Sequence, residues 1–392
     1  MKKIISITIT VFLLLSLMVG CGGGAPAGGG NTGDNVVKIG VFEPASGDNG
    51  AGGKQESLGV YYANQLTPTV TIDGVEYTVK LESADNQSST EKAPSAAQTL
   101  VAAGCSVILG SYGSAVCNAA GPVFGDAGIP AIGITCTNPQ VTLNNEHYFR
   151  ICFLDPFQGT VLANLAQKQF DAKKAYVLAK LGDDYSVGLA NYFMEAFDGE
   201  VVYDQFPDGT SDYSTYVTNA ITQGAHVFFS PVSTEAAALI IDQAATQGMT
   251  IPILAGDTWD SNVILDAAMG KDLKIYVTTF YQEGGAPEFD SGIKDWLNAN
   301  PTHLANNGGN DKIAAVSAMG FDAYYVALEA LKAAGSTDPG DVLAILPDVT
   351  YSGVSGPIAF DENGDAIRDT AFVKLCNTET GEWEFFAQQG IN

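Results

Sequence analysis

The sequence predicts an α/β protein made of two doubly wound lobes, each a mostly parallel sheet with helices on both faces. Three observations support this fold class. Short apolar runs alternate with helical patterns from Val37 onward, and the alternation starts again after Leu154. The chain has 392 residues, more than one ordinary hydrophobic core accommodates. Apolar residues make up 46% and charged residues 16%, which is typical of a well-packed globular protein.

The first series contains four expected strands separated by helices. The strands are residues 37–42, 77–81, 106–109 and 130–134. A glycine-rich loop over 46–53 leads into a helix over 54–65. Ser88 and Glu91 have capping-box spacing before a helix that ends at Ala103. This β-α-β order is typical of a parallel sheet covered by helices.

The second series repeats the same order. Its expected strands are 175–179, 201–206, 227–230 and 251–254, and its helices lie near 156–169, 186–197, 212–223 and 234–247. A strand over 275–281 and a long helical pattern over 314–334 follow. The end of the chain, from Tyr351, has strand character, with Asn363-Gly364 as a hairpin turn. Two successive sheets fit this pattern better than one large sheet.

The amino terminus predicts export. Lys2 and Lys3 precede an apolar run over 4–19 that ends at Gly20-Cys21, which is typical of a bacterial secretory signal over residues 1–20. A membrane anchor is the weaker alternative, because the run is shorter than the ~20 residues that a bilayer requires. The segment Met18-Val-Gly-Cys21 resembles a lipoprotein lipobox, which implies that Cys21 carries acyl chains. Residues 21–35 then form a flexible glycine-rich tether, so we expect an extracytoplasmic protein anchored to the cell membrane by lipid.

Charge and cysteine usage exclude several classes of partner. The formal net charge is −26, and removal of residues 1–20 takes away two lysines and no acid. So acidic a surface repels nucleic acid and anionic membrane surfaces. Five cysteines remain after Cys21, an odd number without CxxC spacing, so we predict buried free thiols rather than a metal site, with one disulfide among the four that lie within 48 residues as the alternative. The five are Cys105, Cys117, Cys136, Cys152 and Cys376.

The sequence offers little for catalysis. His147, His226 and His303 are scattered, without the spacing of a metal-binding motif. The segment starting at Gly113 lacks the second glycine of a nucleophile elbow. No nucleophile–base pair can be assembled, so we predict no enzyme activity, no cofactor and no metal, and a secreted hydrolase is the weakest alternative.

The loops that follow strands are the candidate ligand site, because open α/β sheets bind ligands beyond the carboxyl ends of their strands. These loops are 111–114, 135–138, 183–185, 231–234 and 257–259. The first lobe supplies hydroxyls and backbone N–H groups, which suit a carboxylate. The second lobe supplies carboxylates and aromatic residues, and an Asp in a partly dry cleft suits an ammonium group. The groups supplied by the two lobes together predict a zwitterionic ligand.

A series of motifs along the chain carries a family resemblance. In order they are Ile39-Gly-Val with Ser46-Gly47, Gly110-Ser-Tyr-Gly-Ser114, Thr135-Cys-Thr-Asn-Pro139, Phe149-Arg150 with Leu154-Asp-Pro-Phe-Gln-Gly159, Asp184-Tyr-Ser-Val-Gly188, Gly256-Asp257, Gly320-Phe-Asp-Ala-Tyr324 and Gly356-Pro-Ile-Ala-Phe-Asp361. Together they resemble the leucine/isoleucine/valine-binding branch of the type I periplasmic binding proteins. The resemblance spans essentially all of residues 36–392.

The resemblance implies two Rossmann-like lobes joined by three crossovers, near 154–157, 279–284 and 352–357. Lobe 1 would comprise 36–154 plus 283–353, and lobe 2 would comprise 155–282 plus 354–392, with the helix around Asp322 returning to lobe 1. The implied function is the substrate-binding protein of an ABC importer. It would be a monomer that captures an amino acid, branched-chain or otherwise apolar, by hinge closure and docks on permease and ATPase subunits.

The resemblance also implies roles for individual residues. Ser114 and Thr137 would hold the ligand carboxylate, and the backbone at Thr135 would accept from the ligand ammonium. Asp257 would be the acidic partner of that ammonium. Tyr185 would close over the ligand from the second lobe, and Asp155 would sit at the hinge beside the cleft.

One departure leaves the ligand side chain open. Gly52 lies where relatives carry an aromatic residue against the ligand, so one wall is missing unless Tyr112, Phe153 or Trp259 replaces it. Amides, urea and aromatic carboxylates therefore remain alternative ligands. A ligand-sensing ectodomain remains an alternative function.

Overall fold

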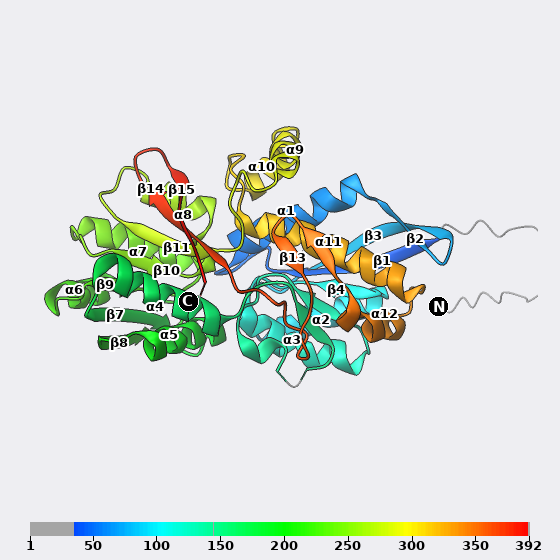
Figure 1. The fold of residues 1–392 in the computed structure, drawn as a ribbon, viewed down its shortest axis with the longest axis horizontal. Coiled ribbons are helices and arrows are strands. Elements are labelled where there is room, and N and C mark those ends of the chain that lie inside the picture. Colours follow the sequence, from blue (N-terminus) through cyan, green and yellow to red (C-terminus); the bar gives the residue numbers. More distant parts are fainter. Residues whose placement is uncertain (1–34, 144, 391–392) are drawn as a thin grey trace, which may run out of the picture. The chain divides into compact units, whose positions relative to one another are not determined.

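The computed structural model describes residues 35–143 and 145–390. The predicted signal peptide, the predicted lipid anchor at Cys21 and the tether up to residue 34 lie outside the described residues. Figure 1 shows two groups of helices and strands, which correspond to the two predicted lobes.

The first sheet has the strand order β2-β3-β1-β4-β5-β6, and all its neighbours are parallel except β2 and β3. Its strands are β1 (Val36–Glu43), β2 (Thr69–Ile72), β3 (Val75–Asp85), β4 (Val107–Leu109), β5 (Ala131–Gly133) and β6 (Tyr148–Arg150). The helices that pack on it are α1 (Gly50–Leu66), α2 (Ala93–Ala103), α3 (Ser114–Asp126), α11 (Ala315–Ala334) and α12 (Pro339–Ile345). The strands β4, β5 and β6 are fully buried, as expected for a parallel sheet covered on both sides.

The second sheet has the order β15-β14-β11-β10-β9-β7-β8. Its strands are β7 (Lys174–Lys180), β8 (Glu200–Phe206), β9 (Val227–Phe229), β10 (Ile253–Ala255), β11 (Ile275–Thr279), β14 (Ala371–Asn377) and β15 (Glu382–Gln389). The accompanying helices are α4 (Asp155–Phe170), α5 (Asp184–Ala196), α6 (Ser214–Thr222), α7 (Thr234–Thr246) and α8 (Asn262–Ala268). Alternate residues of β7 enter two separate cores: Tyr176 lies in one, and Ala175 and Val177 lie in the other. The sheet is therefore covered on both faces, and the predicted fold class is confirmed.

The connections between the sheets follow the expected crossovers in part. The chain passes from β6 to α4, and from β11 through α9 (Pro287–Asn298) and α10 (Pro301–Asn306) back to α11. Two glycines let α1 and α11 approach closely: a Cβ at Gly59 would lie 2.8 Å from the backbone nitrogen of Phe321, and one at Gly320 would lie 3.3 Å from that of Val60. The helix that contains Asp322 packs on the first sheet.

The third crossover lies later than the sequence suggests. Beyond β12 (Tyr351–Gly353) and β13 (Gly356–Ile358), the Arg150 backbone N–H donates to the Gly364 carbonyl at 2.9 Å, and Phe360 packs on Phe149. Residues 356–366 thus belong with the first sheet rather than with lobe 2. The division into lobes remains our proposal, with this adjustment. The predicted turn at Asn363-Gly364 is present, since Phe360 pairs antiparallel with Ala366 across it.

Two local predictions are wrong. The glycine-rich segment 50–53 is the first turn of α1 and not a loop, because Gly53 allows the helix to pack on Pro44 at the end of β1, where a Cβ would lie 2.5 Å from Pro44 Cγ. Ser88 and Glu91 form no capping box. Instead α2 begins at Ala93, and the Ser88 hydroxyl accepts from the Asn49 backbone N–H at 3.0 Å.

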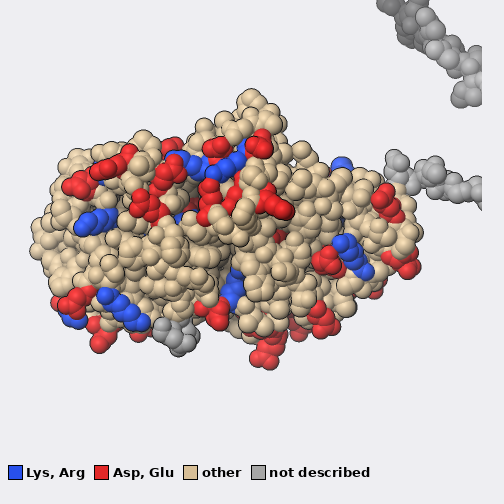
Figure 2. Space-filling view, turned by 45° about the horizontal axis from the view of Figure 1, so that its top comes forward, with Lys and Arg blue, Asp and Glu red and all other residues tan. Residues whose placement is uncertain are grey.

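Acidic side chains predominate among the charged groups on the described surface, as the composition of the chain predicts. Figure 2 shows acidic side chains spread over the face in view, with lysines and arginines in a few small groups. Within residues 35–143 and 145–390, no helix has both the length and the apolar character needed to cross a membrane.

Candidate ligand-binding cleft

Residues from both lobes line a cleft at the carboxyl ends of the two sheets. The first lobe contributes residues that follow β1 and β4, and the second contributes residues that follow β7, β9 and β10. Its lining includes Asn49, Tyr112, Ser114, Lys180, Tyr185, Ser233 and Thr258. The space left between these side chains is only ≈ 40 Å³, much less than the ~300–1,000 Å³ of small-molecule sites. The cleft is therefore too small, in this conformation, for a ligand of that size.

Polar contacts hold the two lobes together across this cleft. The Tyr112 hydroxyl donates to the Thr258 carbonyl at 3.1 Å. The Asn138 side-chain amide donates to the Asp184 carbonyl at 2.7 Å, and the Lys180 ammonium pairs with Asp48 at 2.6 Å. Such contacts exchange readily for contacts with water, which suits an interface that opens and closes.

The first lobe presents two hydroxyl groups, one at the N-terminus of α3 and one in the loop after β5. Ser114 is the first residue of α3 and is 2% exposed, and its oxygen accepts from the Asn138 backbone N–H at 3.2 Å. The Thr137 hydroxyl is fully buried and has no hydrogen-bond partner among the described residues. Both hydroxyls retain a proton to donate, and the α3 N-terminus favours an anion. The structure thus gathers the two residues predicted to hold a carboxylate.

The second lobe presents Asp257 in the short 3₁₀ helix η2 (Asp257–Trp259). Its Oδ1 accepts from Gln158 Nε2 at 2.9 Å and from the Tyr185 hydroxyl at 3.0 Å, and the residue is 2% exposed. Burial raises the pKa of Asp257 to about 6, so its carboxylate is ionised at neutral pH. Burial also raises the pKa of Tyr185 well above its ordinary value, so this hydroxyl remains a donor.

Asp155 occupies the first position of α4, where the chain enters the second lobe. Its backbone N–H donates to the Thr137 carbonyl at 3.0 Å, which joins the hinge to the hydroxyl-bearing loop. The side chain is fully buried, and neither oxygen has a hydrogen-bond partner among the described residues. Burial raises the pKa of Asp155 well above its ordinary value. A protonated Asp155 avoids burying an unpaired charge at the hinge.

The Tyr112 ring fills the space beside Gly52. A Cβ at Gly52 would lie 2.5 Å from Tyr112 Cε2, so the tyrosine takes the place of the missing wall. Trp259 packs in the core of the second sheet, fully buried, and its indole N–H has no partner among the described residues. Phe153 belongs to the core of the first sheet and packs on Phe280. Of the three predicted replacements, Tyr112 is the one against Gly52.

Sequence reasoning missed two buried carboxyl groups, Glu43 at the end of β1 and Glu56 in α1. They are 4% and 0% exposed, respectively. Glu43 Oε2 accepts from the Tyr112 backbone N–H at 2.8 Å, and the Thr135 hydroxyl donates to Glu56 Oε2. Burial raises the pKa of Glu56 to about 8, and burial together with the Glu56 carboxyl raises that of Glu43 well above its ordinary value. The sequence did offer a signal for Glu43, because this residue directly follows the predicted strand over 37–42, where ligand-binding loops begin.

The cysteines and the acidic residues form no metal site in the part of the chain that the structure describes. The five cysteines after Cys21 are free and buried, which confirms the predicted state. They act as small hydrophobic side chains in the cores.

Gly52→Ala tests the packing of Tyr112. Alanine favours the helix, but its methyl group displaces the tyrosine ring, and overpacking of this kind costs about 1–3 kcal/mol. We expect ligand affinity to fall by about tenfold, measured by calorimetry, because Tyr112 then loses its contact with Thr258. Tyr112→Phe is the matched variant that keeps the ring and removes only the hydroxyl. An unchanged ligand affinity in Gly52→Ala would contradict the role of the Tyr112 ring as the side of the cleft beside Gly52.

The buried carboxyl groups predict that stability falls as pH rises. A raised pKa means that the folded protein binds the proton more tightly than the unfolded chain, so this stability is lost with increasing pH. For Glu56 the window runs from 4.5 to about 8. We therefore expect a higher Tm at about pH 5.5 than at about pH 8 by differential scanning calorimetry, and a smaller difference in Glu56→Gln. A Tm that rises across this window would refute the prediction.

Comparisons with known proteins identify the family of this chain. A family model described as periplasmic binding protein matches residues 36–380. The Leu/Ile/Val-binding protein homolog 1 of Brucella abortus is 28% identical over 346 residues, which cover 86% of this chain and 89% of that protein. The leucine-binding protein of Thermotoga maritima has a TM-score of 0.79 and 31% identity, covering 91% of this chain and 99% of its own. A benzoate-bound solute-binding protein of R. palustris has a TM-score of 0.76 at 17% identity, covering 91% and 97%, and shares the fold. The chain belongs to the periplasmic binding protein family, and is a binding protein and not an enzyme.

Proposed function

We propose that this protein is the extracytoplasmic receptor of an ABC importer and captures an α-amino acid by closing its two lobes around it. The observation that carries the proposal is the opposite polarity of the two walls. Ser114 offers a donor at the N-terminus of α3 and Thr137 offers one from the loop after β5, and Asp257 offers a buried carboxylate on the other side. A zwitterion matches both walls at once, whereas a simple anion or cation matches one.

Closure follows from the division of these groups between lobes. A ligand that docks on Ser114 and Thr137 in the open form reaches Asp257 and Tyr185 only when the second lobe closes. Because those contacts exist in one state alone, the ligand shifts the population toward that state. The hydrogen bonds that Tyr112 and Asn138 donate across the cleft further stabilise the closed form.

The ligand side chain would lie against Tyr112 and Tyr185. We expect a branched-chain or other apolar side chain, in keeping with the names of the Brucella abortus and Thermotoga maritima proteins. An aromatic carboxylate is the second candidate, because the same hydroxyls and tyrosine rings suit a benzoate-like acid. Asp257 weighs against it, since a buried carboxylate disfavours a ligand whose only charge is negative.

A thermal-shift screen tests the proposal. The panel contains the twenty amino acids, benzoate, 4-hydroxybenzoate, acetamide and urea. A ligand present at 100 times its Kd stabilises the folded state by about 2.7 kcal/mol, a readily measured rise in Tm. We expect one or a few amino acids to raise the Tm. A response to benzoates or amides alone would refute amino-acid capture.

We also propose that Cys21 is acylated and tethers a monomeric receptor to the membrane, beside a permease with ATPase subunits. The lipobox-like segment Met18-Val-Gly-Cys21 supports the anchor. Several acyl chains would hold the protein firmly, at about 0.8 kcal/mol for each buried methylene. Metabolic labelling with palmitate should mark the wild-type protein and not Cys21→Ala. Equal labelling of both would exclude this anchor.

A further inference from the structure

Both N–H groups of the Gln158 side chain are directed at the second-lobe side of the cleft. Gln158 lies in the first turn of α4 and is fully buried. Its Nε2 donates to Asp257 Oδ1 at 2.9 Å and to the Thr278 hydroxyl oxygen at 2.8 Å. The two hydrogen atoms of the amide are therefore both used, and this side chain has no further N–H group to offer.

The orientation of this amide is coupled to the charge of Asp257. Gln158 Oε1 is buried and has no hydrogen-bond partner among the described residues. A flipped amide would place Oε1 against the Asp257 carboxylate, where two acceptors repel each other. An ionised Asp257 therefore holds the N–H groups of Gln158 toward itself, and these N–H groups in turn favour the ionised carboxylate.

The side chains that donate to Asp257 all come from the second lobe in the described part of the chain. Gln158 lies in α4, Tyr185 lies in α5, and the second acceptor of Gln158, Thr278, lies in β11. Both donors reach Oδ1, which leaves Oδ2 to a ligand ammonium. Because these bonds do not cross the cleft, they persist when the lobes separate and hold Asp257 ready before the ligand arrives.

The charge of Asp257 depends on these neutral donors. Burial raises the pKa of Asp257 to about 6, and among the hydrogen bonds that oppose this rise the one from Gln158 lowers the pKa most. Lys374 of β14 pairs with Asp260 at 2.9 Å. The titratable groups that interact with Asp257 are, from the first lobe, Glu56 in α1, Tyr112 after β4 and Cys152 after β6, and, from the second, Asp155 in α4, Tyr185 in α5 and Asp260 after η2. None of these groups is basic, so hydrogen bonds keep the carboxylate ionised.

We infer that Gln158 is a positioning residue for ligand capture, which keeps the Asp257 carboxylate ionised for the ligand ammonium. This inference rests on the proposed capture of an amino acid and deepens it. Gln158 acts through Asp257 and contributes no donor of its own to the ligand. The receptor consequently releases an amino acid in mildly acidic surroundings, because a protonated Asp257 attracts an ammonium only weakly.

Isothermal titration calorimetry between about pH 5 and about pH 8.5 tests this inference. The probe is the one of the twenty amino acids that gives the largest rise in Tm in the thermal-shift screen. Gln158→Met keeps much of the side-chain volume and removes both N–H groups. Gln158→Asn keeps an amide that is one methylene too short to reach Asp257. Gln169→Met, at an exposed position of the same helix, is the matched control.

In the wild-type protein we expect the affinity to fall about tenfold for each pH unit below about 6. In both Gln158 variants the fall should begin about one pH unit higher, because a carboxylate that loses a donor has a higher pKa. Their affinity should thus be about fivefold weaker than that of wild type at about pH 6 and within about twofold of it at about pH 8.5. Gln169→Met should follow the wild-type curve.

The wild-type curve decides if neither Gln158 variant folds. A fall in affinity that begins at about pH 6 supports the inference, since the carboxylate then remains ionised at neutral pH despite its burial. A fall that begins at about pH 7 or above overturns it, and so does an affinity that stays constant down to about pH 5.

The failures of the two proposals are distinguishable. Amino-acid binding in which both Gln158 variants follow the wild-type pH curve overturns the role of Gln158 and leaves amino-acid capture standing. A loss of affinity that is the same at every pH means a merely structural role for Gln158 and overturns the inference in the same way. An absence of binding by any amino acid in the thermal-shift panel overturns both proposals.

Discussion

Asp257→Asn should weaken amino-acid binding by at least about 100-fold, since removal of one partner of a buried charge pair costs about 2–5 kcal/mol. Asparagine keeps the size of the side chain and an oxygen that can accept from Gln158 and Tyr185. The substitution therefore removes the charge while it preserves the shape of the second-lobe wall.

The matched control for this prediction is Asp266→Asn, which changes an exposed carboxylate in α8. Calorimetry with the best amino acid from the thermal-shift screen measures the loss. Binding of an uncharged amide such as acetamide, if detected, should change much less, because it offers no ammonium. Amino-acid affinity within threefold of wild type would exclude Asp257 as the ammonium partner, at a threshold of about 0.65 kcal/mol.

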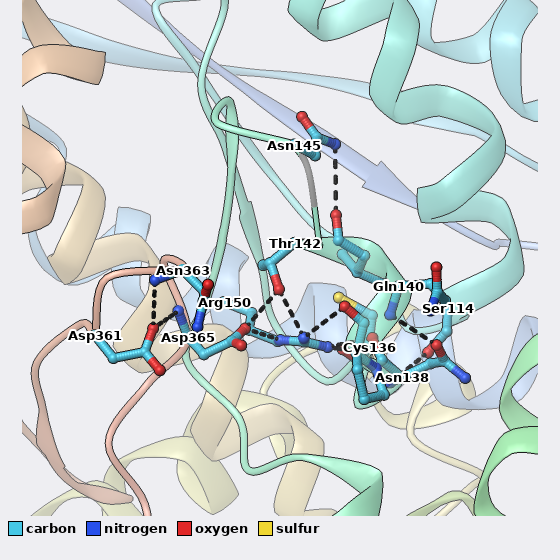
Figure 3. Close-up of polar contacts among 12 residues, drawn as sticks. Ser114, Cys136, Asn138, Gln140, Thr142, Asn145, Arg150, Asp361, Asn363 and Asp365 are labelled. Atoms are coloured by element: carbon cyan, nitrogen blue, oxygen red, sulfur yellow. Dashed lines mark hydrogen bonds and ion pairs between the residues drawn. The ribbon is translucent and has the colours of Figure 1, made fainter.

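Arg150→Met should lower the free energy of unfolding by about 3–5 kcal/mol, the usual cost of breaking a buried ion pair from one side. Arg150 in β6 is fully buried, and its Nε donates to Asp365 at 2.5 Å. Its guanidinium also donates to the carbonyls of Cys136 and Asn138 and to the Thr142 hydroxyl (Figure 3). Methionine fills much of the volume but removes every one of these donors, and leaves Asp365 with the Thr142 hydroxyl in place of the guanidinium.

The same substitution should reduce ligand affinity, because Arg150 fixes both sides of the loop that carries Thr137. Urea unfolding followed by circular dichroism measures the stability. Lys168→Met, which removes an exposed positive charge from α4, serves as the control and should stay within about 0.5 kcal/mol of wild type. A loss below about 1 kcal/mol in Arg150→Met would contradict the assigned role of this network.

The sheet strands and the main helices were predictable because their signals are local. Runs such as Val37–Phe42 and Ala175–Ala179 are apolar and short, and the helices between them have helical periodicity. The start of α1 was not predictable, since glycines in sequence indicate a loop, and only the contact of Gly53 with Pro44 explains a helix there. The third crossover depends on a pair, Arg150 and Asp365, whose members are 215 positions apart.

Some residues of the candidate site were likewise predictable from the sequence and others were not. Ser114, Thr137 and Asp257 follow strands directly, so the rule for open α/β sheets located them. Glu56 lies inside a helix with other polar residues, and its burial depends on how α1 meets α11 and the loop after β5. The replacement of the Gly52 wall by Tyr112 likewise results from tertiary packing and has no signature in either segment alone.

The crystal structure of the protein with the amino acid that most raises its Tm is the most direct test of the central claim. Capture of a zwitterion between two walls predicts a carboxylate within hydrogen-bond distance of the Ser114 and Thr137 hydroxyls. It also predicts an ammonium within hydrogen-bond distance of Asp257 and the Thr135 carbonyl, with Tyr185 closed over the ligand. A ligand held by one lobe alone, or with its carboxylate toward Asp257, would contradict the claim.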